Sequence, residues 1–141
     1  MEPAKAQFIP PLGEAHRRGI QTSLRLLDEM LGEVASYARG REVRSVLFEE
    51  RNRLSARQRN GLLDEIGRMK RVLAEIKTTL GLRREVQDVG SRIWSRSASF
   101  WEVLVETESR HLARYGRVPE GLGDYLDPRI EELIAGLQSV S

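Results

Sequence analysis

One pair of side chains in the chain has the spacing of metal ligands. Glu108 and His111 form a Glu-x-x-His motif, the arrangement that places two ligands on one helical face in dinuclear carboxylate bundles. A complete site of that kind needs a second Glu-x-x-His motif and two further inward-facing glutamates. The sequence contains no second copy of the motif. A metal-dependent bundle enzyme is therefore a remote alternative, and we predict no metal-binding residue.

Other reactive groups are scarce. The chain has no cysteine and only two histidines, which excludes thiol catalysis, disulfides and histidine-rich metal sites. No set of nucleophile, base and orienting group can be assembled, and no glycine-rich phosphate loop is present. Glu102 and Glu106 could hold Mg²⁺ only opposite a second acidic helix, and the sequence identifies none. We therefore expect a non-enzymatic protein with no catalytic residues and no cofactor.

Positive charge is concentrated in the middle of the chain. The 141 residues include 23 basic and 21 acidic ones, for a formal net charge of +2. Residues 41–84 carry twelve basic and six acidic residues, whereas residues 85–141 carry six basic and ten acidic ones. The basic segment can contact phosphate groups or form a solvated surface with many ion pairs. The candidate phosphate-contacting residues are Arg51, Arg53, Arg57 and Arg59.

Apolar residues recur every three or four positions from Glu14 onward, which predicts amphipathic helices. The first helix either ends near Ala38 or continues through Gly40 to about Arg53. We favour continuation, because residues 39–53 contain no proline and few turn-forming residues besides Gly40. The apolar stripe of this helix consists of Ile20, Leu24, Leu27, Leu31, Val34 and Ala38.

A second helix is predicted from its two ends. Ser55 and Gln58 have the spacing of a capping box, and Gly81 is a suitable C-terminal stop. The apolar stripe between them consists of Leu62, Ile66, Met69, Leu73, Ile76 and Leu80.

A third helix is expected from about Arg84 to Tyr115, with Trp94 and Trp101 in its apolar face. The last helix is expected to begin at Asp127, with Pro128 in its first position. The fold class is therefore all-α, an antiparallel helical bundle of three long helices plus a shorter C-terminal helix.

The length of the chain suits one domain. We expect residues 1–13 to form an extended N-terminal arm, because Pro10 and Pro11 favour polyproline II, and residues 14–141 to form a single helical-bundle domain. No apolar run approaches the length needed to span a bilayer, and no secretory signal is visible. We expect a cytoplasmic protein with no membrane partner.

A first helix that reached Arg53 would extend beyond the second helix. The overhang would expose Val43, Leu47, Phe48 and Leu54, which makes these residues the candidate interface. The leading hypothesis is a protein that acts through protein–protein contacts, most simply as a homo-oligomer and in particular a dimer. Nucleic-acid binding by the basic surface of residues 41–84 is the alternative. In composition and pattern the chain is similar to small bacterial helical-bundle proteins.

Overall fold

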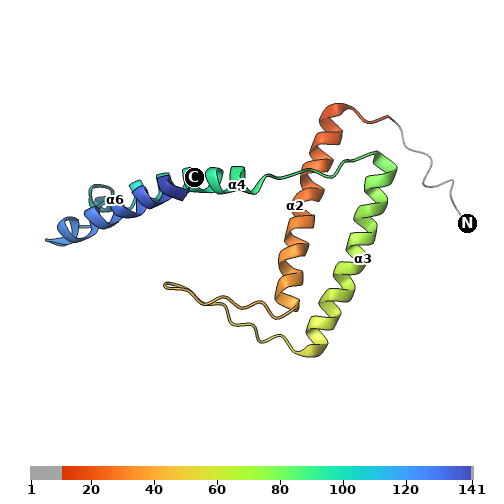
Figure 1. Ribbon diagram of the computed structural model, residues 1–141, viewed down its shortest axis with the longest axis horizontal. Coiled ribbons are helices and arrows are strands. Elements are labelled where there is room, and N and C mark those ends of the chain that lie inside the picture. Colours follow the sequence, from red (N-terminus) through yellow and green to blue (C-terminus); the bar gives the residue numbers. More distant parts are fainter. Residues whose placement is uncertain (1–10, 141) are drawn as a thin grey trace, which may run out of the picture. The chain divides into compact units, whose positions relative to one another are not determined.

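The computed structural model describes residues 11–140, and all regular elements within that range except one isolated β-bridge are helical. The all-α class is thus confirmed (Figure 1). The predicted N-terminal arm falls largely on residues 1–10, which lie outside the described range. The helices are α2 (Glu14–Ala38), α3 (Ala56–Leu80), α4 (Val89–Val105), α5 (Ser109–Leu112), the 3₁₀ helix η1 (Ala113–Tyr115) and α6 (Leu122–Val140).

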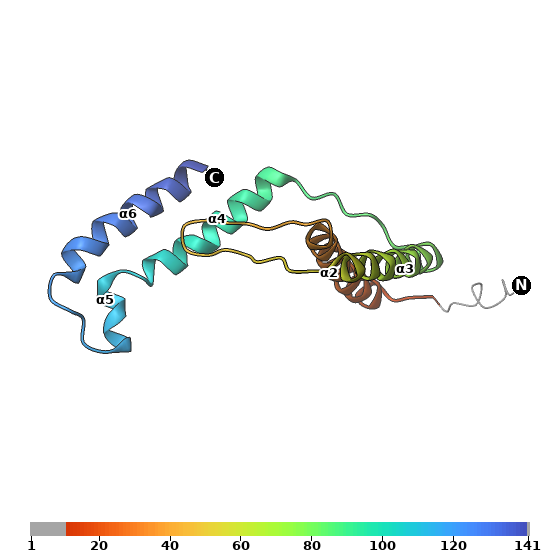
Figure 2. The same cartoon turned by 90° about the horizontal axis from the view of Figure 1, so that it is seen from below.

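The chain divides into two compact units, Met1–Arg84 and Glu85–Ser141, and each is described by itself. In the first unit α2 and α3 form an antiparallel pair, and in the second α4 pairs with α6 (Figures 1 and 2). The prediction of one bundle domain over residues 14–141 stays a prediction. No helix within residues 11–140 is both long and apolar enough to cross a membrane.

The core of the first unit confirms the two predicted apolar stripes. Leu31 is 1% exposed and packs with Ala35 and Ile66, so the buried line runs between α2 and α3. Burial of such side chains is the main stabilising contribution to a helix pair. The partly buried residues that pack against this line are Leu27, Val34, Leu63, Met69 and Leu73.

Both ends of α3 are as predicted. The Gln58 N–H donates to Ser55 Oγ at 3.1 Å, and the Ser55 N–H donates to Gln58 Oε1 at 2.8 Å, which completes the capping box. Gly81 ends the helix with φ of +67°, in the left-handed region that glycine adopts without strain. At that end Arg17 of α2 donates to the Leu80 carbonyl at 2.8 Å, which fixes the antiparallel alignment.

The predicted continuation of the first helix through Gly40 is wrong. Helix α2 ends at Ala38, and Gly40 has φ of +101°, a conformation that residues with a side chain rarely adopt. The Arg41 N–H donates to the Ser36 carbonyl at 3.0 Å and the Gly40 N–H to the Tyr37 carbonyl at 2.9 Å. These bonds satisfy carbonyls that the helix end leaves free, and they turn the chain away from the helix axis.

The predicted third helix, Arg84 to Tyr115, is also wrong in its limits. Asp88 caps α4 by accepting from the Ser91 N–H at 2.9 Å, so the helix begins at Val89. It ends at Val105, where Thr107 Oγ1 donates to the Val103 carbonyl at 2.9 Å. A threonine side chain that bonds to a nearby carbonyl competes with the helical hydrogen bond at that position.

Asp127 does not cap α6, which corrects a further prediction. Helix α6 begins five residues earlier, at Leu122, and contains Pro128. Asp127 instead accepts from the Ser109 N–H at 2.8 Å and from Ser109 Oγ at 2.7 Å. These hydrogen bonds lower the pKa of the Asp127 carboxyl below 3.8, with the Ser109 hydroxyl as the largest cause. A carboxylate from α6 thus caps the start of α5.

Replacing Leu31 with alanine tests the core of the first unit. We expect Leu31→Ala to lower the free energy of unfolding by about 2–5 kcal/mol, because it leaves a cavity between α2 and α3. Leu26→Ala is the matched control, since Leu26 lies on the same helix and is exposed. Chemical denaturation followed by circular dichroism measures both. Equal losses in the two variants would contradict the packing.

Replacing Asp127 with asparagine tests the α5–α6 contact through its pH dependence. Because the pKa of Asp127 is lowered on folding, its ionised form stabilises the fold above the unfolded pKa. This stabilisation is lost as the pH falls through the lower, folded-state value. We expect Asp127→Asn to lower the thermal midpoint of the second unit at neutral pH. The difference from the unmutated chain should shrink as the pH falls below 3.8. A difference that does not change with pH would contradict this role.

Candidate functional site

The connection between α2 and α3 is a two-stranded ribbon that reverses direction at its far end (Figure 1). Arg44 and Glu49 form an antiparallel bridge. The Glu50 N–H donates to the Val43 carbonyl at 2.7 Å, and the Ser45 N–H donates to the Phe48 carbonyl at 2.9 Å. The short spacing between Ser45 and Phe48 defines a tight turn. We call residues 39–55 the ribbon loop and Val46–Phe48 its tip.

Glu50 holds the base of the ribbon loop to α2. Its carboxylate accepts from the Tyr37 hydroxyl at 2.9 Å and from the Val43 N–H at 3.2 Å, and it lies 3.9 Å from the Arg41 guanidinium. The guanidinium of Arg41 also lies over the Tyr37 ring, 5.0 Å from its centre. The hydrogen bond to Glu50, followed by burial, raises the pKa of the Tyr37 hydroxyl above 10.0.

Asn52 provides the second tie at the base. Its side-chain amide donates to the carbonyls of Tyr37 at 2.7 Å and of Arg41 at 2.9 Å. Its own N–H donates to a carboxylate oxygen of Glu42 at 2.7 Å, and its side-chain oxygen accepts from the Leu54 N–H. Backbone groups that lack a helical partner are thereby satisfied. The sequence gives no signal for Glu50 or Asn52, because neither lies in a periodic pattern.

The four predicted interface residues do not share one helical stripe. Val43 and Leu54 are half-buried near the base of the ribbon loop, whereas Leu47 and Phe48 are exposed at its tip. Leu47 is 95% exposed, and so is its neighbour Val46 at 93%. The helical overhang that suggested an interface does not exist, because α2 ends at Ala38. An exposed apolar segment is nevertheless present, as the tip of a loop.

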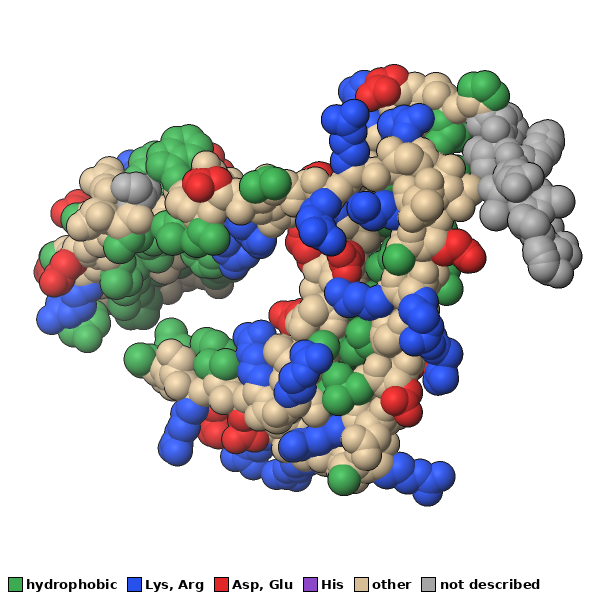
Figure 3. Space-filling model, turned by 45° about the vertical axis from the view of Figure 1, so that its right-hand side comes forward, with side chains coloured by type: hydrophobic (Ala, Val, Ile, Leu, Met, Phe, Trp, Pro, Cys, Tyr) green, Lys and Arg blue, Asp and Glu red, His purple; other side chains and the backbone are tan. Residues whose placement is uncertain are grey.

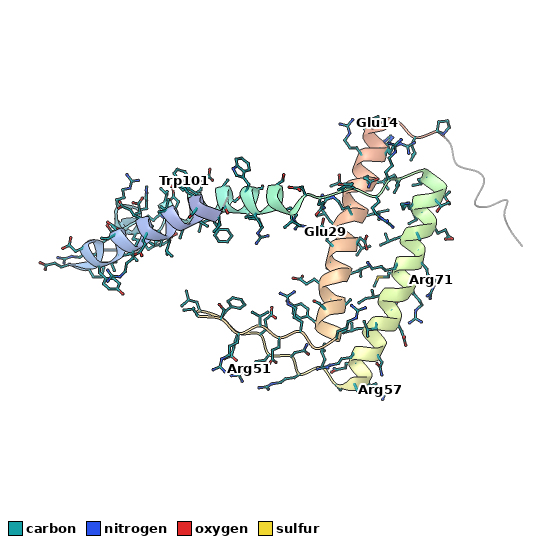
Figure 4. The ribbon with its side chains drawn as sticks, in the orientation of Figure 1. Glu14, Glu29, Arg51, Arg57, Arg71 and Trp101 are labelled. Atoms are coloured by element: carbon teal, nitrogen blue, oxygen red, sulfur yellow. The ribbon has the colours of Figure 1, made fainter. Side chains whose placement is uncertain are left out.

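The four predicted phosphate-contacting arginines lie on the ribbon loop and on the first turns of α3. Figure 4 shows Arg51 on the loop and Arg57 at the start of α3. Arg51 lies 4.0 Å from Glu49, while Arg53 and Arg57 have no acidic partner within residues 11–140. Arg59 is half-buried beside Gly40, and its Nε is buried without a hydrogen-bond partner.

The Glu-x-x-His motif does not form a pair of ligands on one helix. Glu108 precedes α5 in an extended conformation, and its carboxylate lies 3.2 Å from Arg110. His111 donates its backbone N–H to the Glu108 carbonyl, and its buried Nε2 has no partner. Within residues 11–140, no group of three or more histidine or acidic side chains could hold a metal ion.

The second unit has an exposed apolar face on α4. Trp94, Ser97, Ala98 and Trp101 line a shallow groove together with Leu137 and Gln138 of α6. Ser97 is buried between the two helices, but Trp94 is 61% and Trp101 44% exposed. The two tryptophans therefore border the α4–α6 contact and are not its core. Ile93 and Phe100 are also exposed. We call these four large side chains, Ile93, Trp94, Phe100 and Trp101, the α4 face.

No protein-family model, curated protein or solved structure matches this chain.

The raised pKa of Tyr37 gives a test of the base of the ribbon loop. Replacing Tyr115 and Tyr125 with phenylalanine leaves Tyr37 as the only tyrosine of the three. In that background we expect Glu50→Gln to lower the pKa of Tyr37 towards 10.0, because it weakens the hydrogen bond that holds the Tyr37 proton and removes the negative charge that opposes ionisation. Ultraviolet absorbance of the tyrosinate measures the titration. Glu49→Gln is the control and should leave the pKa unchanged. Identical titrations of the Glu50→Gln variant and its parent would contradict the contact.

Proposed function

We propose that this protein is a non-enzymatic helical module that self-associates as a dimer through the α4 face. The observation that supports this proposal is the exposure of Ile93, Trp94, Phe100 and Trp101 on a unit with little buried apolar surface of its own. Ile130 is the one large apolar side chain that is buried among the described residues of this unit. A unit of this size needs more apolar burial for a stable fold.

The width of the apolar surface on α4 exceeds what α6 can cover. Ile93 and Phe100 are seven residues apart and lie on one side of the buried Ser97, while Trp94 and Trp101 lie on the other. A single neighbouring helix covers the line between these pairs and leaves both pairs exposed. Hydrophobic side chains gather over this unit in Figure 3. A helix with so wide an apolar surface is typical of a bundle in which it contacts two others.

A second copy of the chain is the occupant that fits this surface best. Two α4–α6 pairs brought together face to face would make a four-helix bundle, the smallest common arrangement with a closed core. A twofold axis places the same patch on both partners, so the patch has to be complementary to itself. The α4 face satisfies this requirement, since its large residues are all uncharged and apolar.

Nucleic-acid binding is a second candidate, supported by the arginines of the ribbon loop. Of the basic residues on α3, Arg68 lies 2.8 Å from Glu65 and Lys70 lies 2.7 Å from Asp28. Arg44 and Arg53 of the ribbon loop, and Arg57 in the first turn of α3, have no acidic partner among the described residues. Unpaired guanidinium groups are suited to phosphate contacts, whose strength falls steeply with salt concentration.

Light scattering coupled to size-exclusion chromatography tests the dimer. We expect the unmutated chain to have twice the mass of the 16.1 kDa monomer and Trp101→Glu to shift it to the monomer. A buried glutamate at a dimer core would remain unpaired, which is strongly unfavourable. Val86→Glu is the control, since Val86 is 95% exposed and lies outside the α4 face.

The helical circular dichroism signal separates dissociation from unfolding in the Trp101→Glu variant. Phe100→Glu tests whether the pair on the other side of Ser97 also lies in the dimer contact. A monomeric unmutated chain would contradict the proposal, and so would a dimer that survives both substitutions. An elevated ratio of absorbance at 260 nm to that at 280 nm across the peak, which disappears at high salt, would instead support nucleic-acid binding.

A further inference from the structure

The tip of the ribbon loop consists of three consecutive apolar side chains with no described residue over them. Val46 and Leu47 are almost fully exposed, and Phe48 is more than half exposed. Two well-ordered ties, at Glu50 and Asn52, hold the loop base to α2, so the tip is presented on a supported ribbon. Exposed apolar groups of this kind are unfavourable in water and usually mark a contact site.

The ribbon loop has more unpaired basic side chains than unpaired acidic ones. The three acids of the loop are engaged: Glu50 with Tyr37, Glu42 with the Asn52 N–H, and Glu49 near Arg51. The five arginines of the loop outnumber them, and those with no acidic partner among the described residues are Arg39, Arg44 and Arg53. Figure 3 shows apolar side chains at the end of the loop with basic side chains next to them. The loop therefore presents an apolar tip backed by permanent positive charge.

We propose that the ribbon loop docks the protein on the surface of an anionic phospholipid bilayer, with Val46–Phe48 inserted and the arginines among the headgroups. Arg44 lies two residues before the tip and Arg51 three residues after it. At a rise of roughly 3.3 Å per residue, these arginines lie about 7–10 Å behind the tip along the strands. Apolar groups of surface-bound segments enter a bilayer to a depth of about 5–10 Å. Such insertion brings the guanidinium groups to the level of the lipid phosphates.

The combination of features favours lipid over the other partners that bind arginine. A nucleic acid would use the guanidinium groups but would leave Val46 and Leu47 in water. An apolar pocket on a protein would take the tip but has no need of the unpaired arginines around it. A bilayer surface with anionic lipids satisfies both parts of the loop. The expectation of no membrane partner rested on the lack of a spanning segment, which peripheral docking does not require.

This proposal does not depend on the dimer proposed above. The ribbon loop belongs to the first unit and the α4 face to the second. A monomeric chain can dock through the loop, and a dimer can form without lipid. The following experiment therefore measures binding to vesicles and not the mass of the protein in solution.

Flotation of the full chain with vesicles tests the proposal. We expect binding to vesicles of phosphatidylcholine and phosphatidylglycerol, and weaker binding to phosphatidylcholine alone or at high salt. Leu47→Asp should weaken binding about tenfold or more, while Leu47→Ile should preserve it. Val86→Asp is the matched control, because Val86 is as exposed as Leu47 and lies outside the loop. It should bind as the unmutated chain does.

The basic part of the loop is tested in the same assay. We expect Arg44→Gln and Arg53→Gln each to weaken binding to the anionic vesicles about fivefold. Arg83→Gln is the control, since Arg83 lies at the end of the first unit away from the loop in sequence. An equal loss with Arg83→Gln would show an effect of net charge alone and would overturn the assignment to the loop.

Insertion of the tip is measured directly with a fluorescent label. The chain has no cysteine, so Val46→Cys gives one labelling site for an environment-sensitive dye, and Val86→Cys gives a control site. We expect a blue shift at position 46 on adding anionic vesicles and none at position 86. A dye at position 46 that is already shielded without lipid would overturn the proposal in favour of a protein contact. Failure to bind vesicles would overturn it as well. So would binding of duplex DNA by the unmutated chain that is lost in Leu47→Asp, because the tip would then contact nucleic acid.

Discussion

An antiparallel pair of helices can bury only the side chains that lie between its two members, and this limit governs both units of the protein. In the first unit pairing buries Leu31 and Ile66 between α2 and α3, although Leu26, Met30 and Val72 remain exposed. In the second unit the apolar surface of α4 is wider than its contact with α6. The same pairing therefore gives a covered core in one unit and an uncovered face in the other. The proposed dimer follows from this difference.

The end of α2 is the second constraint on the structure. Gly40 allows the chain to turn in a conformation that few other residues adopt, and Asn52 and Glu50 bind the backbone and the Tyr37 hydroxyl that this turn leaves available. These polar contacts hold the base of the ribbon loop. The apolar residues that would have formed an overhang on a longer helix lie instead near the base or at the tip of the loop. The exposure of Leu47 and Phe48 at the tip thus follows from the turn at Gly40 and the polar contacts at the base of the loop.

Charge adds a further distinction between the two proposed surfaces. On α3, Arg68 pairs with Glu65 one turn away, and Lys70 pairs with Asp28 across the helix contact. In the ribbon loop Glu42 and Glu50 hold the base, while Arg39, Arg44 and Arg53 have no acidic partner among the described residues. Residues 39–55 carry five arginines and three acidic residues. The α4 face, by contrast, is uncharged. We infer that the two surfaces suit different kinds of partner.

The sequence alone was sufficient to predict the all-α class, the stripes of α2 and α3, the capping box at Ser55 and the stop at Gly81. These features depend on residues a few positions apart, and short-range periodicity and capping rules describe them well. The end of α2, the limits of α4 and the role of Asp127 were predicted wrongly. The end of α2 and the role of Asp127 involve hydrogen bonds between residues far apart in the sequence, such as that from the Asn52 side chain to the Tyr37 carbonyl and that from the Ser109 N–H to Asp127. The limits of α4 instead depend on local bonds, of Asp88 with the Ser91 N–H and of Thr107 with the Val103 carbonyl, which the apolar periodicity does not reveal. The exposure of Trp94 and Trp101 likewise required the tertiary structure, because periodicity identifies an apolar side chain but not whether a neighbouring helix covers it.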